Sequence, residues 1–257
     1  MISLPTKPKI VKKQGNRAIF QIEGLFPGYG ITIGNTLRRV LLSSLEGAAI
    51  VQVKIKGAPH EFSTISGILE DAVVILMNLK KVRFKLFTDE PQTAVLSVKG
   101  VKEATAKDFK LSSQTKIANP ELHIASLTKA SASLNIEAVI EKGTGYQPSE
   151  MRQSGKSAVG ALPLDAIFTP IVNVSLKVEN MRVGKRTDFD RLILEVETDG
   201  TILPEKAMAE AIEILRKHYD ILAKEFPKEE KEEKAAEKKT TKKASKKKPA
   251  KKTTPKK

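Results

Sequence analysis

Alternating apolar and polar side chains predict strands with one buried face in three parts of the chain. The first is residues 17–25 (RAIFQIEGL), and the second is residues 172–179, which place Val172, Val174, Leu176 and Val178 on one face. The third is residues 191–200, which turn Leu192, Leu194 and Val196 inward and end in an Asp-Gly pair typical of a turn. A further strand is expected at residues 48–57, residues 81–142 look β-rich, and the Gly-, Pro- and Ser-rich residues 143–167 resemble an extended loop.

Helical spacing of apolar residues predicts three helices. The helix expected at residues 35–46 has a core face made of Ile33, Leu37, Val40, Leu41 and Ser44. Its opposite face carries Asn35, Arg39, Leu42, Ser43 and Glu46. An exposed leucine beside an arginine is typical of a binding hot spot. The alternative is that Leu42 packs under a neighbouring strand while Arg39 pairs with Glu46.

The second helix is expected within residues 67–82, from the spacing of Leu69, Ala72, Val73, Leu76 and Leu79. The third begins at Pro204 and ends near Phe226. Its apolar positions follow a 4, 3, 4, 3, 4 spacing, which we call the seam: Met208, Ile212, Leu215, Tyr219, Leu222 and Phe226. Ala211, Ile214 and Ile221 widen this stripe, which favours contacts with both the home domain and a partner. The alternative is a helix buried in its own domain.

The glycines in residues 27–39 (PGYGITIGNTLRR) suggest a phosphate-binding loop. The spacing Gly28-x-Gly30-x-x-x-Gly34 is one residue longer than the dinucleotide fingerprint. The following strand ends in VKIKG and lacks the acidic residue that would hold a ribose. No G-K-[ST] follows, so a P-loop is excluded as well, and nucleotide binding is disfavoured.

The net charge of +15 is concentrated near the end of the chain. Residues 227–257 contain 14 lysines and 5 glutamates, whereas residues 1–226 contain 31 basic and 25 acidic residues. This tail has almost no apolar side chains, which predicts disorder. It acts either as a solvated tail or as a non-specific nucleic-acid tether.

Chemistry-bearing residues are few. The chain has no cysteine, which excludes disulfides and thiolate metal sites and fits a reducing cytoplasm. We expect neither a signal peptide nor a membrane span. His60, His123 and His218 match no catalytic or metal motif and are expected at the surface or an interface. Asp188 and Asp190 suggest a metal, but are expected to cap or turn into the following strand. No catalytic and no metal-binding residue is predicted.

Four long segments, in order, carry a family resemblance: GYGITIGNTLRRVLLSSLEGAAI, HEFSTISGILEDAVVILMNLK, GTGYQPS and RVGKRTDFDRLILEVETDGTILPEKAM. They resemble the bacterial RNA polymerase alpha subunit family, over most of residues 15–226. The resemblance implies an α+β fold with a discontinuous dimerisation subdomain, mainly antiparallel sheet plus two helices, from residues 1–46 and 170–226. A β-rich insertion subdomain would span residues 47–169, and the disordered lysine-rich tail residues 227–257.

The resemblance also implies a role: a homodimer on which the beta and beta-prime subunits assemble for transcription, joined by omega and sigma. The expected dimer interface is Leu37, Leu41, Met208, Ile212, Leu215, Tyr219, Leu222 and Phe226. The expected contacts with the large subunits are Asn35, Arg38, Arg39, Leu42, Lys80, Leu164 and Asp165, the last two facing beta-prime. The nucleotidyltransferase chemistry and its Mg²⁺ would belong to a large subunit, with no cofactor on this chain.

One departure from the family concerns DNA. The family usually carries a helical C-terminal domain that binds promoter DNA, and here the lysine tail follows instead, so selective DNA contacts are in doubt. The expected location is cytoplasmic, beside the nucleoid, with a bacterial rather than a plastid origin. A nucleotide-dependent enzyme and a free-standing basic chromatin-type protein are the alternative classes.

Overall fold

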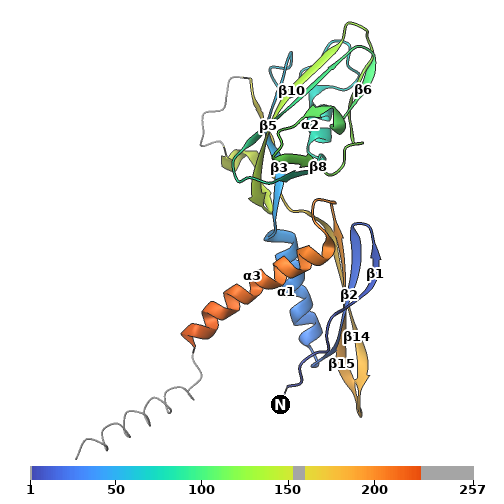
Figure 1. Cartoon of the computed structure of the whole chain (residues 1–257), viewed down its shortest axis with the longest axis vertical. Helices are drawn as coiled ribbons and strands as arrows, with labels where there is room; N and C mark the ends of the chain where they lie inside the picture. The colour runs from blue at the N-terminus through green and yellow to red at the C-terminus, as the bar shows by residue number, and fades with distance from the viewer. Residues whose placement is uncertain (1, 153–159, 227–257) are drawn as a thin grey trace, which may run out of the picture. The chain divides into compact units, whose positions relative to one another are not determined.

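The computed structural model describes residues 2–152 and 160–226 (Figure 1). The chain divides into two units between Ile212 and Glu213. The predicted disorder of the tail concerns residues 227–257, which lie outside the described residues.

A four-stranded antiparallel sheet joins strands from distant parts of the sequence, in the order β1-β2-β15-β14. Its strands are β1 (Lys9–Gln14), β2 (Arg17–Leu25), β14 (Ile171–Val183) and β15 (Arg186–Thr198). Leu194 lies opposite Phe20 and Val196 opposite Ala18, and all four are buried. This burial follows from the alternation in both strands, because cross-strand partners share one face of a sheet. Leu192, Leu194 and Val196 are inward as predicted.

The prediction for Val172 was wrong, because this side chain is 58% exposed. The register between β14 and β15 shifts between Ile171 and Asn173. Such a bulge adds one residue to a strand and turns the preceding side chains to the other face. Val174 stays buried, whereas Leu176 and Val178 are partly buried under the first helix.

Helix α1 (Tyr29–Ser43) packs on this sheet and begins six residues before the predicted start. Gly30 and Gly34 are therefore residues of the helix itself and not of a loop before it. A Cβ on Gly34 would collide with the methyl groups of Leu176 and Leu192. The two glycines let α1 approach its own sheet closely. Only Gly28, at the N-cap with φ of 85°, uses a left-handed conformation here.

The second sheet has seven strands, with the order β7-β5-β10-β3-β4-β8 and with β12 beside β3. Its strands are β3 (Glu46–Ile55), β4 (Phe84–Leu86), β5 (Gln92–Lys99), β7 (Phe109–Lys110), β8 (Thr115–Ile117), β10 (Ser133–Thr144) and β12 (Leu162–Pro163). Two pairs stand beside it: β6 (Lys102–Thr105) with β9 (His123–Leu127), and β11 (Tyr146–Gln147) with β13 (Ala166–Ile167). Two short 3-10 helices are η1 (Ala106–Asp108) and η2 (Ser149–Arg152). The predicted loop thus contains three short strands and η2.

Helix α2 (Ala72–Leu79) packs its buried Ile75 and Leu79 into the core of the second sheet, with Leu96 and Ile136. It is shorter than predicted, because the Asp71 carboxylate accepts the N–H of Val74 at 2.9 Å and caps the helix. Leu69, which was assigned to the apolar face of the helix, precedes this cap and is 74% exposed.

Phe168 lies in a notch on the other face of this sheet. Gly47 of β3 and Gly143 of β10 are direct cross-strand partners. A Cβ on Gly143 would come within 2.6 Å of the Phe168 ring, and one on Gly47 would overlap the Phe168 carbonyl oxygen. Phe168 is buried there with Ala49, Val51 and Ala166. The two glycines therefore make room for the chain as it returns from the second sheet to the first.

Helix α3 (Pro204–Glu225) begins at Pro204 as predicted and buries Ala207, Met208 and Ala211. The fold is α+β with mostly antiparallel sheets, which confirms the predicted class. The subdomain boundaries at residues 46 and 170 stay a prediction. Within the described residues, no helix is long and apolar enough to cross a membrane.

Candidate docking surfaces

The N-terminus of α1 is capped by a side chain from a distant strand. The Oδ2 atom of Asp190, in β15, accepts the backbone N–H groups of Gly28 and Gly30, each at 2.9 Å. These are the groups that a phosphate-binding loop would offer to a ligand. Because a buried carboxylate already occupies them, this stretch does not form a phosphate cradle. Asp190 was expected to cap or turn into its own strand, whereas it caps α1.

Helix α1 carries four of the seven predicted contact residues, and three of them face solvent. Asn35, Arg38 and Arg39 are exposed. Leu42 was predicted to be exposed, but it is half-buried. The alternative pairing of Arg39 with Glu46 is not among the ion pairs between described residues. The planar guanidinium groups of Arg38 and Arg39 thus face solvent, and each can hold a carboxylate or carbonyl group in a bidentate fashion.

The other three predicted contact residues come together beside α2. The ammonium of Lys80 lies 2.9 Å from Oδ2 of Asp165, and the backbone N–H of Ser149 donates to Oδ1 at 3.0 Å. These two donors hold the pKa of the Asp165 carboxyl well below its usual range. Lys80 and Asp165 are 85 residues apart in sequence, so only the fold brings them together.

Lys80, Leu164 and Asp165 line the same hollow, of about 310 Å³, together with apolar side chains of α2 and Phe62. Leu164 is buried in the core, with only 5% exposed, so it forms the floor and not a protruding contact. By contrast, Phe62 and Met77 are strongly exposed. An apolar hollow with an ion pair at its rim is suited to a protruding side chain of a partner. Sequence reasoning missed both residues: Met77 stands in the apolar run of α2, which resembles a core, and Phe62 is a single aromatic residue between polar neighbours.

The predicted dimer residues fall into two groups. Leu37, Leu41 and Met208 are buried within the chain, which agrees with the core face inferred for the first helix and leaves them little surface for a second copy. Ile212 is 47% exposed. In the second unit, Leu215 is half-buried, while Tyr219, Ile221, Leu222 and Phe226 are exposed.

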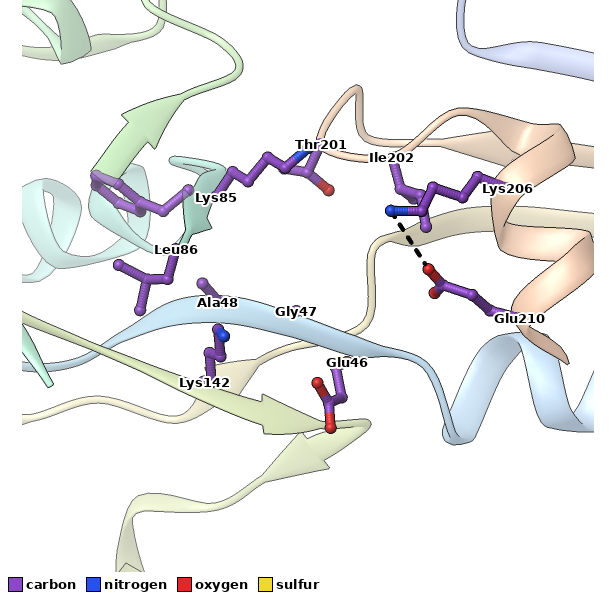
Figure 2. A pocket seen from close by; sticks show the side chains of 11 residues that line it. Glu46, Gly47, Ala48, Lys85, Leu86, Lys142, Thr201, Ile202, Lys206 and Glu210 are labelled. Atoms are coloured by element: carbon purple, nitrogen blue, oxygen red, sulfur yellow. Dashed lines mark ion pairs between the residues drawn. The ribbon is translucent and has the colours of Figure 1, made fainter. Parts of the chain in front are cut away.

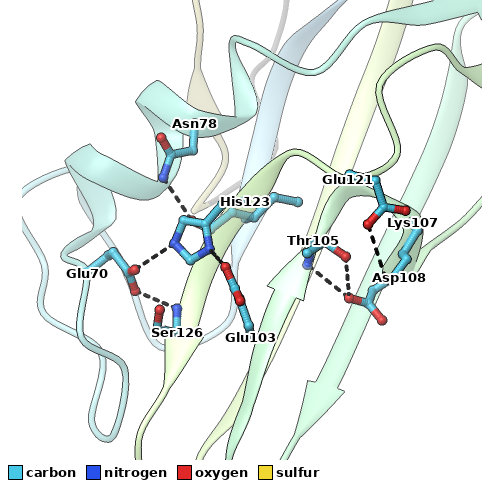
Figure 3. Close-up of polar contacts among 10 residues, drawn as sticks. Glu70, Asn78, Glu103, Thr105, Lys107, Asp108, Glu121, His123 and Ser126 are labelled. Carbon is cyan, nitrogen blue, oxygen red and sulfur yellow. Dashed lines mark hydrogen bonds and ion pairs between the residues drawn. The ribbon is translucent and has the colours of Figure 1, made fainter.

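His123 was predicted at the surface or an interface, and it forms a three-residue cluster with two glutamates (Figure 3). Its Nε2 lies 2.9 Å from Oε1 of Glu70, and its Nδ1 lies 2.7 Å from Oε1 of Glu103. Burial opposes charging of the imidazole, but the two carboxylates outweigh it and raise the pKa of His123 above its ordinary 6.5. Glu70 also accepts the N–H of Ser126 at 2.7 Å. The cluster ties the loop before α2 to β9.

A second hollow, of about 190 Å³, lies where β3, β4 and β10 meet the start of α3 (Figure 2). Lys85, Lys142 and Lys206 line it together with Glu46 and Glu210. Lys206 lies 3.7 Å from Glu210, and Lys142 pairs with Asp89 at 2.5 Å. The charges that line this hollow are therefore mixed, and some of them are paired.

No group of three or more His, Cys, Asp or Glu side chains suited to a metal ion occurs within residues 2–152 and 160–226. The two candidate surfaces, the α1 face and the α2 hollow, are of the kind that binds proteins: arginines, exposed apolar side chains and one ion pair.

Comparison with known proteins places these surfaces in context. A family model described as the RNA polymerase Rpb3/RpoA insert domain matches residues 53–169. The chain is 42% identical over 219 residues to the DNA-directed RNA polymerase subunit alpha of Oceanobacillus iheyensis, covering 84% of this chain and 69% of that protein. It is 44% identical over 222 residues to the subunit of the same name from Roseiflexus castenholzii, covering 86% and 68%. The subunit of that name from Cytophaga hutchinsonii is 46% identical over 218 residues, covering 84% and 66%.

Proposed function

Because this chain belongs to the family of bacterial DNA-directed RNA polymerase alpha subunits, we propose that it is a non-catalytic assembly subunit. In this role it pairs with a second copy and offers the pair as a platform to the beta and beta-prime subunits. The observation that carries the proposal is the set of side chains suited to protein contacts that stay exposed on α1, α2 and α3.

Pairing uses the exposed apolar side chains of α3. Tyr219, Leu222 and Phe226 of the seam are 59%, 54% and 79% exposed, and Ile221 beside them is 61% exposed. An apolar stripe on a helix is stable in water when a second surface covers it. A second copy brings an identical stripe, so a two-fold arrangement covers both at once. Leu37 and Leu41 are buried, so they are not assigned to the surface of this interface.

Docking of the large subunits uses two surfaces. On α1, Asn35, Arg38 and Arg39 present polar and charged groups around the half-buried Leu42. Beside α2, Lys80 and Asp165 border the hollow that Phe62 and Met77 surround. Since Lys80 contacts Asp165, we assign both to a single docking surface, where the sequence suggested separate ones.

The chemistry of the complex, with its Mg²⁺, belongs in this proposal to a large subunit, and omega and sigma join the assembled enzyme. The histidines and paired carboxylates of the described residues have structural partners, as for His123 and Asp190. Transcription places the complex in the bacterial cytoplasm, beside the nucleoid.

The test is light scattering and beta-subunit capture with the full chain and two variants, Arg39→Ala and the matched control Arg182→Ala on the exposed end of β14. All three are expected to form dimers. Loss of a hot-spot arginine costs about 2 kcal/mol or more, so Arg39→Ala should weaken capture of beta by roughly 30-fold, whereas Arg182→Ala leaves it unchanged. A monomeric wild-type chain, or equal capture by all three, overturns the proposal.

A second pair of variants tests the dimer surface. Tyr219→Glu with Leu222→Glu places two charges on the exposed stripe and is expected to give monomers. The control Lys217→Glu with Lys224→Glu changes charge on the same helix without touching the seam and is expected to stay dimeric. A dimer that survives the first pair unchanged contradicts the assignment of pairing to α3.

A further inference from the structure

Part of one face of the second sheet is neither apolar nor covered. On its inner face, Val53, Leu96 and Ile136 enter the core against α2. At one end of its outer face, Phe168 and Ala166 cover Val51 and Ala49. The other end bears four exposed lysines, which we call the lysine face: Lys54, Lys56, Lys99 and Lys110.

The register fixes how these lysines are arranged across four strands. Lys54 of β3 lies opposite Glu137 of β10, Glu137 opposite Val95 of β5, and Val95 opposite Lys110 of β7. Directly opposite residues share one face of a sheet. One row thus has a lysine at each end, and neighbouring strands are about 4.8 Å apart.

The adjoining rows extend the same surface. Asn135 lies opposite Ser97, and the Ser97 hydroxyl lies 2.7 Å from the Asn135 side-chain oxygen. The Lys56 backbone N–H bonds to the Asn135 carbonyl oxygen at 3.0 Å, which places Lys56 beside that row. Lys99 lies opposite Ser133 in the next row. The lysine side chains are therefore spread both along and across several neighbouring strands.

The charges on this surface are unbalanced. Glu137 is the one carboxylate among the residues that line its hollow, of about 680 Å³, against the three lysines 54, 56 and 99. Ion pairs in the second sheet and its loops involve other lysines, such as Lys102 with Asp108 and Lys142 with Asp89. The lysine face thus keeps its positive charge available for a ligand.

The composition of the face selects the kind of ligand. Protein interfaces are depleted in lysine, serine and glutamate and enriched in aromatic residues and arginine. The lysine face has the opposite composition, with Val95 as its exposed apolar member. Lys, Ser and Asn side chains are typical donors to phosphate oxygens. No aromatic ring lines the hollow, so it lacks the stacking platforms that hold single strands.

We propose that the lysine face binds the sugar–phosphate backbone of double-stranded DNA without reading its sequence. Lys54, Lys56 and Lys99 neutralise phosphates, and Asn135 and Ser97 add polar contacts between them. Glu137 lies in the same row as Lys54, so it repels the phosphates nearest to it and limits the affinity. This site uses residues of the second sheet and none of the lysine tail, and it does not rest on the proposed assembly role.

The test measures binding of the full chain to a 30-base-pair duplex of random sequence at several salt concentrations. The variant Lys54→Gln, Lys56→Gln, Lys99→Gln is compared with the control Lys12→Gln, Lys129→Gln, Lys185→Gln, which removes the same charge from exposed positions elsewhere. Each phosphate contact contributes about 0.9 to the slope of log K against log salt. The first variant should lower this slope by about 2 to 3, and the control should leave it unchanged.

Three further readouts keep the outcome decisive. Circular dichroism melting must show both variants folded, and the conservative variant Lys54→Arg, Lys56→Arg, Lys99→Arg should restore the slope. An equal effect of the two glutamine variants, or no effect of either, overturns the proposal. So does a face variant that loses binding to polyglutamate while keeping the DNA slope, since that result assigns the face to an acidic protein.

Discussion

Asp190 holds the N-terminus of the first helix: its carboxylate accepts the N–H of Gly30 at 2.9 Å and that of Gly28 at the same distance. The carboxylate comes from a strand 160 residues further along the chain. A negative group at a helix N-terminus also interacts favourably with the helix dipole. This contact explains how a glycine-rich stretch forms a helix end without any phosphate.

We expect Asp190→Ala to destabilise the chain, because the N–H groups of Gly28 and of the buried Gly30 lose a charged acceptor. Hydrogen bonds to charged groups contribute about 1.5–3 kcal/mol each, so the free energy of unfolding should fall by about 2 kcal/mol or more. Urea unfolding of the full chain measures it. The matched control is Asp188→Ala, whose exposed carboxylate pairs with Arg186 and whose loss should cost far less stability. Equal losses for the two variants would contradict the capping role.

Gly30→Ala is expected to destabilise the chain even though alanine favours helices. Its Cβ would come within 2.9 Å of the Asp190 Cβ and of a Val178 methyl group. Both neighbours are stiff, since Asp190 is held by its hydrogen bonds and valine is β-branched. Overpacking costs about 1–3 kcal/mol, whereas the exposed control Asn35→Ala on the same helix should be neutral or slightly stabilising. A melting temperature of Gly30→Ala equal to or above that of the wild type would contradict the close approach of α1 to its sheet.

Gly47 and Gly143 should respond differently to substitution, although they face each other. Gly143→Ala places a methyl group against the Phe168 ring, so adding Phe168→Leu should relieve part of the loss. Gly47→Ala meets the Phe168 carbonyl oxygen, which no side-chain change removes. We therefore expect a double-mutant cycle, measured by urea unfolding, to give a coupling free energy of about 0.5 kcal/mol or more between Gly143 and Phe168. The coupling between Gly47 and Phe168 should be small. Equal coupling at both positions is the contrary result.

The His123 cluster predicts a pH-dependent stability. Because the folded state raises the pKa of His123, its contribution is fully present below the ordinary value of 6.5 and is lost as pH rises through the folded pKa. The pKa of Glu70 is lowered, since the Ser126 N–H and His123 outweigh the opposing effect of burial, so its contribution is present above 4.5 and lost at lower pH. The stability difference between the wild type and His123→Gln should be largest between pH 4.5 and 6.5.

Melting temperatures of both proteins from pH 4 to 9 measure this difference. The control His218→Gln removes an exposed histidine that bonds to a backbone carbonyl, and should give a difference that varies less with pH. A constant difference for His123→Gln would show that the two carboxylates do not stabilise its charged form.

The pattern of apolar and polar residues along the chain was enough to predict the regular strands and helices. Strand β2 and the inward residues of β15 follow directly from alternation, and α3 begins at Pro204 because proline suits a first helical turn. The α+β class follows from the same patterns. These features depend on neighbours along the chain, which a sequence displays.

Two of the failures have long-range causes, and the one at α2 has a local cause. The start of α1 depends on Asp190, and the exposure of Val172 depends on a bulge against β15. Leu69 was assigned to the helix that became α2, but the Asp71 side chain caps the helix two residues later, so Leu69 lies outside it. Within the candidate surfaces, Arg39 and Lys80 could be named from their motifs. The Lys80–Asp165 pair and the His123 cluster join residues distant in sequence, so no local pattern reveals them.

The notch that receives Phe168 has a consequence for how the family can diverge. Gly47, Gly143 and Phe168 occupy one shared volume, although they stand far apart in the sequence. A relative that gains a side chain at the Gly143 position is expected to carry a smaller residue at the Phe168 position, and the two changes should arise together. The Gly47 position has no such compensating partner. Substitutions of Gly47 should therefore be rare among relatives, while the residues at the other two positions co-vary.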